Sequence, residues 1–168
     1  MVDLFREAEL FPYGNDTTSA LQRARAKQFV EVFLAKVNTF YYAAVVRGEP
    51  NVGAGLVESI KKFVEPLIPD TTFIIGEKFG LAEILVSPFL IRLYLLAKLG
   101  LLGDGIDAKF AEATKWDKWA RATLANESLR STFNYEFEAR KAVDRIRKIR
   151  EAAKVSSNGA TVANGAKA

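Results

Sequence analysis

The sequence predicts an all-α fold, with six or seven helices arranged around one central apolar helix. Apolar residues recur at helical spacing in several long segments, and no segment shows the period-two alternation of a strand. The stretch 81–99 is apolar on nearly every side, with only Glu83, Arg92 and Lys98 charged. A helix that is apolar all round lies in a core or in a membrane. Pro88 and Arg92 interrupt the stretch before it reaches the roughly 18 apolar residues of a membrane span. We therefore expect a buried central helix and no membrane segment.

The longest predicted helix covers 19–47. Ser19 and Gln22 match a capping box, in which an N-cap Ser and a Gln three residues later each accept a free backbone N–H. Gly48 and Pro50 end the helix. One wide face carries its apolar residues at helical spacing, namely Phe29, Val30, Phe33, Leu34, Val37, Phe40, Tyr41, Ala44 and Val45.

A third helix is predicted over 51–68, and a turn follows at 70–79. The central helix then begins at Gly80, where Glu83 can accept the N-cap backbone N–H, the backward half of a capping box. Pro88 has no N–H, so the carbonyl of Ile84 loses its helical partner, and we expect a kink there.

Three further segments complete the bundle. A helix over 106–125 carries Trp116 and Trp119, and a short connecting helix follows at 126–133, with Asn126 as its N-cap. The last helix, 135–153, is strongly charged. Residues 154–168 contain too little apolar surface to order themselves, so we expect a disordered tail.

Composition excludes several kinds of chemistry. The 168 residues contain no Cys and no His, which excludes disulfides, thiolate nucleophiles, imidazole bases and the usual zinc sites. The first residues carry charges at Asp3, Arg6 and Glu7 instead of a leader sequence, so we expect a cytoplasmic protein. Acidic residues interleave with the basic ones in the last helix, which indicates a solvated face and no nucleic-acid partner.

Two segments resemble glutathione transferases, in particular the omega-like enzymes of fungi. The series Gly76, Gly80-Leu81-Ala82-Glu83, Pro88 and Arg92 resembles the sixth helix of that family. The family places Ser or Thr at the cap and Asp at the third position, where this chain has Gly80 and Glu83. The segment LQRARAKQFVEVF resembles the fourth helix of the fungal omega-like enzymes, and Val2 to Pro12 resembles the junction between the two domains.

The resemblance implies the C-terminal helical domain of a glutathione transferase, without the N-terminal thioredoxin-like domain. Residues 1–15 then correspond to a remnant of the domain linker and 16–153 to the helical domain. In this family the first domain binds glutathione and carries the activating Ser, Cys or Tyr. The resemblance therefore assigns this chain no catalytic residue and no cofactor, although glutathione serves the full-length family.

The resemblance also implies a hydrophobic substrate site lined by Phe40, Tyr41 and Tyr42. Tyr42 lies off the main apolar face, so it is the residue that we expect to reach a cleft. The alternative is that Phe40 and Tyr41 are core residues, as aromatic stripes at helical spacing usually are.

The remaining marked residues are expected to be structural. Arg92 needs a carboxylate or carbonyl partner on the apolar helix, and an ion pair is favoured over a catalytic role. Ser19, Gln22, Gly80 and Glu83 are expected to cap helices. Trp116 is expected in the core, and Trp119 either there or facing another domain.

These expectations support two functions from different classes. The first is a glutathione-transferase-like protein that contributes a surface for a hydrophobic small molecule and cannot conjugate glutathione alone. The second is a non-catalytic interaction module of the kind found in translation-elongation-factor gamma subunits, with a second copy or a protein partner covering the exposed domain face. Changing Trp119 or Tyr42 to a charged residue is expected to separate these cases. A third explanation is an incorrectly assigned gene start that omits an upstream thioredoxin-like segment.

Overall fold

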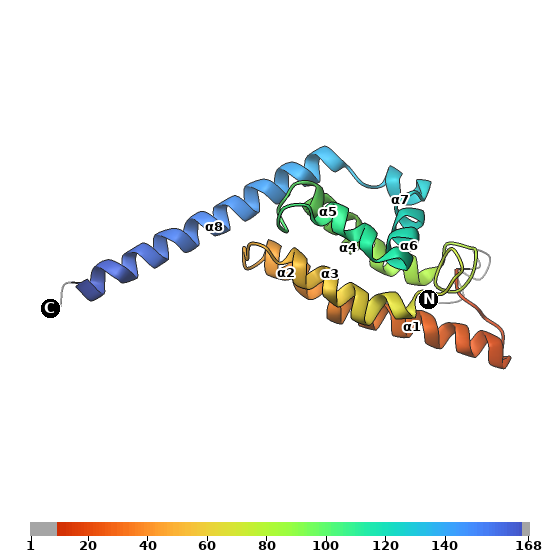
Figure 1. Cartoon of the computed structure of the whole chain (residues 1–168). Coiled ribbons are helices and arrows are strands. Elements are labelled where there is room, and N and C mark those ends of the chain that lie inside the picture. The colour runs from red at the N-terminus through yellow and green to blue at the C-terminus, as the bar shows by residue number, and fades with distance from the viewer. Residues whose placement is uncertain (1–9, 166–168) are drawn as a thin grey trace.

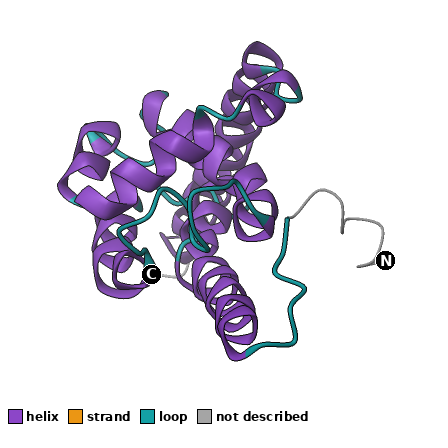
Figure 2. Ribbon diagram, turned by 90° about the vertical axis from the view of Figure 1, so that its right-hand side faces the viewer, coloured by secondary structure: helices purple, strands orange, loops and turns teal. Residues whose placement is uncertain are grey.

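The computed structural model describes residues 10–165, and for 154–165 it describes the backbone alone. Helices and loops make up this part of the chain, which contains no strand (Figures 1 and 2). The all-α prediction is confirmed. The α-helices are α1 (Thr17–Lys36), α2 (Asn38–Val45), α3 (Gly53–Ser59), α4 (Leu81–Lys98), α5 (Ile106–Lys109), α6 (Thr114–Leu124), α7 (Glu127–Ser131) and α8 (Tyr135–Gly165).

Helix α4 lies at the centre of the bundle. Its Val86, Leu90, Leu93 and Leu96 are almost fully buried. The core cluster that contains them also holds aromatic residues of α1 and α6, namely Phe29, Phe33, Trp116 and Trp119. The Phe29 and Trp119 rings meet edge to face at 5.0 Å, and the two indoles lie 5.3 Å apart. Burial of such large side chains is the main favourable contribution to folding, so α1, α4 and α6 form the stable part of the domain.

Helix α4 continues through Pro88 without a break. The carbonyl oxygen of Ile84, which Pro88 cannot satisfy, accepts a hydrogen bond from the Ser87 hydroxyl at 3.2 Å. Ser87 is itself almost fully buried. A side-chain donor beside the proline thus replaces the missing backbone N–H and lets the helix remain intact.

The start of the first helix differs from the prediction. Asp16 is the N-cap of α1, and its carboxylate accepts hydrogen bonds from the backbone N of Ser19 at 2.9 Å and from its Oγ at 2.6 Å. Ser19 therefore lies in the first turn, and the predicted box of Ser19 and Gln22 is wrong. A carboxylate at the N-cap has the additional advantage of the positive helix end.

Three predicted helices are divided in the structure. A turn at Val37 separates α1 from α2, where the Thr39 hydroxyl bonds the carbonyl of Ala35 at 2.9 Å. The segment 51–68 consists of α3, a π-helical turn over Ile60–Val64 and a 3-10 turn over Glu65–Leu67 that contains Pro66. The segment 106–125 consists of α5, a 3-10 turn over Phe110–Glu112, and α6.

The last helix is longer than predicted, because the backbone of α8 is helical to Gly165. The predicted helix end at residue 153 is wrong. The contacts described between α8 and the other helices lie in its first part, and the rest projects beyond the bundle (Figure 1).

Among the described residues, no helix is both long enough and apolar enough to cross a membrane.

Candidate ligand cleft between helices α2, α4 and α8

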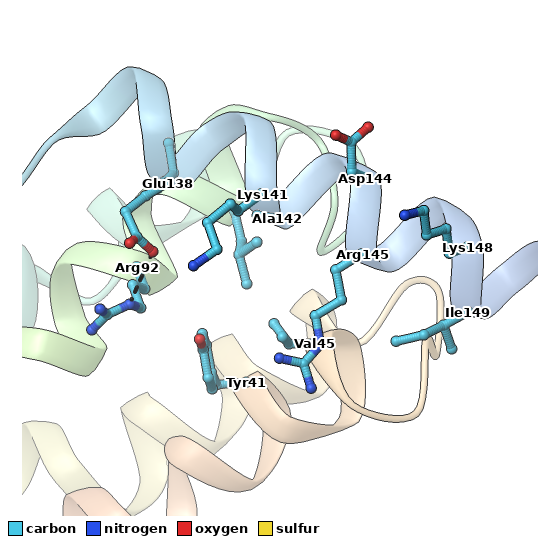
Figure 3. A pocket seen from close by; sticks show the side chains of 12 residues that line it. Tyr41, Val45, Arg92, Glu138, Lys141, Ala142, Asp144, Arg145, Lys148 and Ile149 are labelled. Carbon is cyan, nitrogen blue, oxygen red and sulfur yellow. Dashed lines mark ion pairs between the residues drawn. The ribbon is translucent and has the colours of Figure 1, made fainter.

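A hollow of about 750 Å³ lies between α2, α4 and α8 (Figure 3). Helix α2 contributes one wall, the second half of α4 contributes the floor, and α8 contributes the opposite wall. Its apolar lining residues are Tyr41, Val45, Leu95, Leu96, Ala142 and Ile149, and its charged ones are Arg92, Glu138, Lys141, Asp144, Arg145 and Lys148. A volume of this size fits a small organic molecule.

Two sets of contacts hold α8 over the cleft. Near its start, Glu138 pairs with Arg92 of α4, with 3.5 Å between Oε2 and Nε. Further along, Arg150 donates hydrogen bonds to the carbonyl oxygens of Gly48 at 3.1 Å and Leu101 at 3.3 Å. Ile146, between these contacts, is buried in the core. The cleft thus lies beneath a helix that is fixed to the bundle on both sides of it.

Tyr41 is the aromatic residue of the cleft and is half-buried in it. Its ring meets the ring of Phe89 edge to face at 6.3 Å and that of Tyr42 at 5.7 Å. Burial raises the pKa of the Tyr41 hydroxyl, and the positive charge of Arg92 offsets only part of that effect. The hydroxyl therefore stays protonated at neutral pH, where it can donate a hydrogen bond but cannot act as a base.

The three predicted substrate-site residues do not come together in this cleft. Tyr41 lines it, whereas Tyr42 has a side chain 46% exposed and is not part of the lining. Tyr42 is therefore not among the residues that line this cleft. Phe40 lines a shallow hollow on the other side of α2, where its ring lies against Gly55. Consecutive helical residues point about 100° apart, so the three cannot share one face.

Sequence reasoning missed the lining residues contributed by α8. The interleaved acids and bases along this helix predict a solvated face. Lys141, Arg145 and Lys148 nevertheless follow one another at intervals of four and three, which places them on one side of the helix. That spacing is the feature of the sequence that could have indicated a basic side of the helix.

Glu83 has a structural setting at the start of α4. Its side chain is fully buried, and its Oε2 accepts the N–H of Gly80, the N-cap residue, at 3.1 Å. Its Oε1 accepts the backbone N–H of Ile74 at 2.9 Å and the indole N–H of Trp119 at 3.1 Å. One carboxylate thus joins the 70–79 turn, the start of α4, and α6. Trp119 is buried, so it does not offer a surface for another domain.

Arg92 has partners on three sides. Besides Glu138, its guanidinium donates to the carbonyl of Pro88 at 2.8 Å and lies over the Phe133 ring at 5.8 Å. This arrangement fixes the start of α8 against α4 and gives Arg92 a positioning role at one end of the cleft.

A second, apolar groove lies at the other end of α4. It is lined by Phe11, Ala26, Lys27, Val30, Glu31, Leu81, Ala82 and Leu85. Leu85 is 49% exposed there, and Lys27 pairs with Glu31 at 3.9 Å along its edge.

Neither hollow shows the residues of a metal site. In the part of the chain that the structure describes, no three acidic side chains gather closely enough to hold a metal ion, and the sequence has no His or Cys.

Comparison with known proteins shows which solved structures this fold resembles. No protein-family model matches the chain, and no curated protein matches it. Several solved structures of fungal enzymes match the chain. Glutathione transferase Omega 1C from Trametes versicolor matches with a TM-score of 0.73 and 26% identity, over 88% of this chain and 62% of that one.

A second enzyme of the same fungus, glutathione transferase Omega 2S, matches with a TM-score of 0.67 and 25% identity, over 84% of this chain and 61% of that one. Its structure in complex with 2,4-dihydroxybenzophenone matches with a TM-score of 0.56 and 25% identity, over 92% of this chain and 62% of that one. This chain thus spans less than two thirds of each of these structures. Together with the helix order, these matches show that the chain has the all-α fold of the C-terminal helical type found in fungal Omega glutathione transferases.

Proposed function

We propose that this chain acts as the helical part of a glutathione-transferase-like protein and that the cleft between α2, α4 and α8 binds hydrophobic, aromatic small molecules. The observation that carries this proposal is the half-buried Tyr41 in a hollow of about 750 Å³. Val45, Leu95 and Leu96 supply an apolar surface beside it, so a ligand ring can be removed from water against them.

The similarity to the Omega 2S enzyme supports an aromatic ligand. That enzyme has been solved with 2,4-dihydroxybenzophenone, which has two rings and hydroxyl groups. Tyr41 offers this chain an aromatic edge for a ring and a protonated hydroxyl for a polar group. We propose the same class of ligand here.

The proposal includes that the 168-residue chain does not conjugate glutathione by itself. Its sequence has no Cys or His, and the pKa of Tyr41 is raised, so the cleft offers no thiolate, imidazole or tyrosinate to activate a thiol. Glutathione is the substrate of the enzymes that it resembles, and we expect it to need residues outside this helical part. We also expect a cytoplasmic location.

Titration calorimetry with 2,4-dihydroxybenzophenone tests the ligand proposal. Tyr41→Ala removes the cleft aromatic, and Tyr42→Ala is the matched control because it removes the neighbouring, exposed ring. We expect the first variant to bind about tenfold more weakly, as loss of a contacting aromatic implies, and the second to bind within about threefold of the parent. Equal effects of the two changes, or no binding to the parent, would contradict the proposal. A conjugation assay with glutathione and 1-chloro-2,4-dinitrobenzene is expected to show no turnover.

The apolar groove at the start of α4 favours a second function, a protein-interaction module. Leu85 exposes about half of its side chain in a hollow that is lined mainly by apolar residues, with Lys27 and Glu31 at its edge. Such a surface favours a protein partner or a second copy of the chain. Leu85→Lys is then expected to abolish self-association in sedimentation velocity, while Tyr41→Ala leaves it unchanged. A parent chain that stays monomeric at high concentration would exclude the second copy.

A further inference from the structure

The charge in the cleft is less balanced than its composition implies, because both of its carboxylates already have partners. Glu138 pairs with Arg92 at 3.5 Å, and Asp144 pairs with Arg147, which lies outside the lining, at 2.9 Å. Neither acid is therefore available to neutralise the other cations of the cleft.

Three cations from α8 remain. The Lys141 ammonium lies over the Phe137 ring at 4.9 Å. Arg145 and Lys148 have no carboxylate, carbonyl or aromatic partner among the described residues of the chain. They lie three residues apart on the same side of α8, and Figure 3 shows Arg145 reaching from α8 toward α2. Two unneutralised cations thus lie beside the apolar wall formed by Val45 and Ile149.

The opposite wall adds a neutral hydrogen-bond donor. Tyr41 lies across the cleft from α8 (Figure 3), and the positive charges of Arg92 and Arg145 act on its hydroxyl. An anion between α2 and α8 would meet a donor on one side and two cations on the other. These donors form stronger hydrogen bonds with an anion than with a neutral group. The site should therefore bind an aromatic anion more tightly than a neutral molecule of the same shape.

We propose that the ligands of this cleft are aromatic anions, with the ring against Tyr41 and Val45 and the carboxylate or sulfonate held by Arg145 and Lys148. This inference rests on the proposed function, because it specifies the ligands of the same cleft. It adds a charge preference and two anchoring residues that the fold alone does not imply.

Two fluorescent probes that differ in one group test this preference. They are 8-anilinonaphthalene-1-sulfonate and its uncharged parent N-phenyl-1-naphthylamine, each measured in competition with 2,4-dihydroxybenzophenone. We expect the sulfonate to bind the parent chain about tenfold more tightly, since two partly exposed ion pairs contribute about that much together. Raising the NaCl concentration should weaken the binding of the sulfonate probe and leave the affinity of the neutral probe unchanged.

The double variant Arg145→Gln/Lys148→Gln is expected to bind the two probes equally. Arg140→Gln/Lys109→Gln is the matched control, because it removes the same net charge from exposed side chains outside the cleft, and it should keep the preference. All four side chains are exposed, so the fold is retained, and circular dichroism checks this.

The outcomes separate the two proposals. If both probes compete with the benzophenone and bind equally to the parent chain, or if the control pair loses the preference as fully as the cleft pair, the anion inference is wrong and the proposed function stands. If neither probe nor the benzophenone binds, the proposed function itself fails. A preference for the sulfonate that is insensitive to salt would also overturn the role given to the two cations.

Discussion

The carboxylate of Glu83 gives the sharpest test of how this fold is held together. In Glu83→Gln the side chain keeps its size, but one oxygen becomes an NH₂ group that cannot accept a hydrogen bond. The least costly arrangement leaves the oxygen toward Ile74 and Trp119 and turns the NH₂ toward the N–H of Gly80. One hydrogen bond to a charged acceptor is then lost, and the other two change from a charged to a neutral acceptor.

The size of the effect follows from these contacts. A hydrogen bond to a charged group contributes about 1.5–3 kcal/mol, and an unpaired buried N–H adds a penalty of similar size. We expect the free energy of unfolding to fall by about 3 kcal/mol, a large part of the total stability of about 5–15 kcal/mol that is typical of a domain.

Urea denaturation followed by circular dichroism measures this loss. With a slope of about 2 kcal/mol per molar urea, the midpoint should fall by about 1.5 M. Glu136→Gln, which makes the same chemical change at an exposed position of α8, is the control and should leave the midpoint unchanged. A Glu83→Gln midpoint equal to that of the control would refute the view that this carboxylate joins three parts of the chain.

Three further changes test other features. Hydrogen bonds from Ser19 hold the pKa of the Asp16 carboxyl below its usual value. The charged cap therefore stabilises α1 above about pH 4, and this stabilisation is lost as the pH falls further. In Asp16→Asn, the protection of the Ser19 amide from hydrogen exchange should no longer depend on this titration. Gly48 has a φ of 68° and its Cα faces Ile149, so Gly48→Ala should lower the free energy of unfolding by about 1–3 kcal/mol in a urea titration. Burial raises the pKa of the Tyr94 hydroxyl in the folded chain. Its contribution to the free energy of unfolding is therefore complete below about pH 10 and is lost above that pH, by up to about 1.4 kcal/mol per pH unit. Between pH 8 and 11 the urea midpoint should fall less in Tyr94→Phe than in the unsubstituted chain.

The sequence allowed much of the fold to be predicted, because local patterns determine it. The apolar stretch 81–99 is central because apolar residues cover most of its circumference, which favours burial among other helices. Gly80 and Glu83 marked the start of that helix, since an acid at the third position serves an exposed N-terminal N–H whatever the tertiary structure. Trp116 was expected in the core and is fully buried.

Other features depend on contacts between distant residues. The bond from Trp119 to Glu83 joins residues 36 positions apart, and periodicity cannot reveal it. Asp16 and Ser19 both match the N-cap preference, and sequence alone does not distinguish them, whereas the structure has Asp16 as the N-cap. The division of α1 from α2 depends on the competing hydrogen bond of Thr39, which a count of apolar residues does not register.

The cleft was the least predictable part. Which side of α8 faces the bundle is decided by Ile146, Arg150 and the Arg92–Glu138 pair, and each of these needs a partner from another helix. Without that orientation, Arg145 and Lys148 could not be distinguished from the other basic residues of the helix.

The placement of the cleft charges on α8 has a consequence for how such a protein can diverge. Lys141, Arg145 and Lys148 are exposed and lie outside the aromatic core of α1, α4 and α6. Substitutions at these positions change the charge that a ligand meets, while most exposed substitutions alter stability by less than about 0.5 kcal/mol. Selection can therefore alter the ligand preference through one helix at little risk to folding. Tyr41, which packs against Phe89, is more constrained and should vary less among descendants than the cations opposite it.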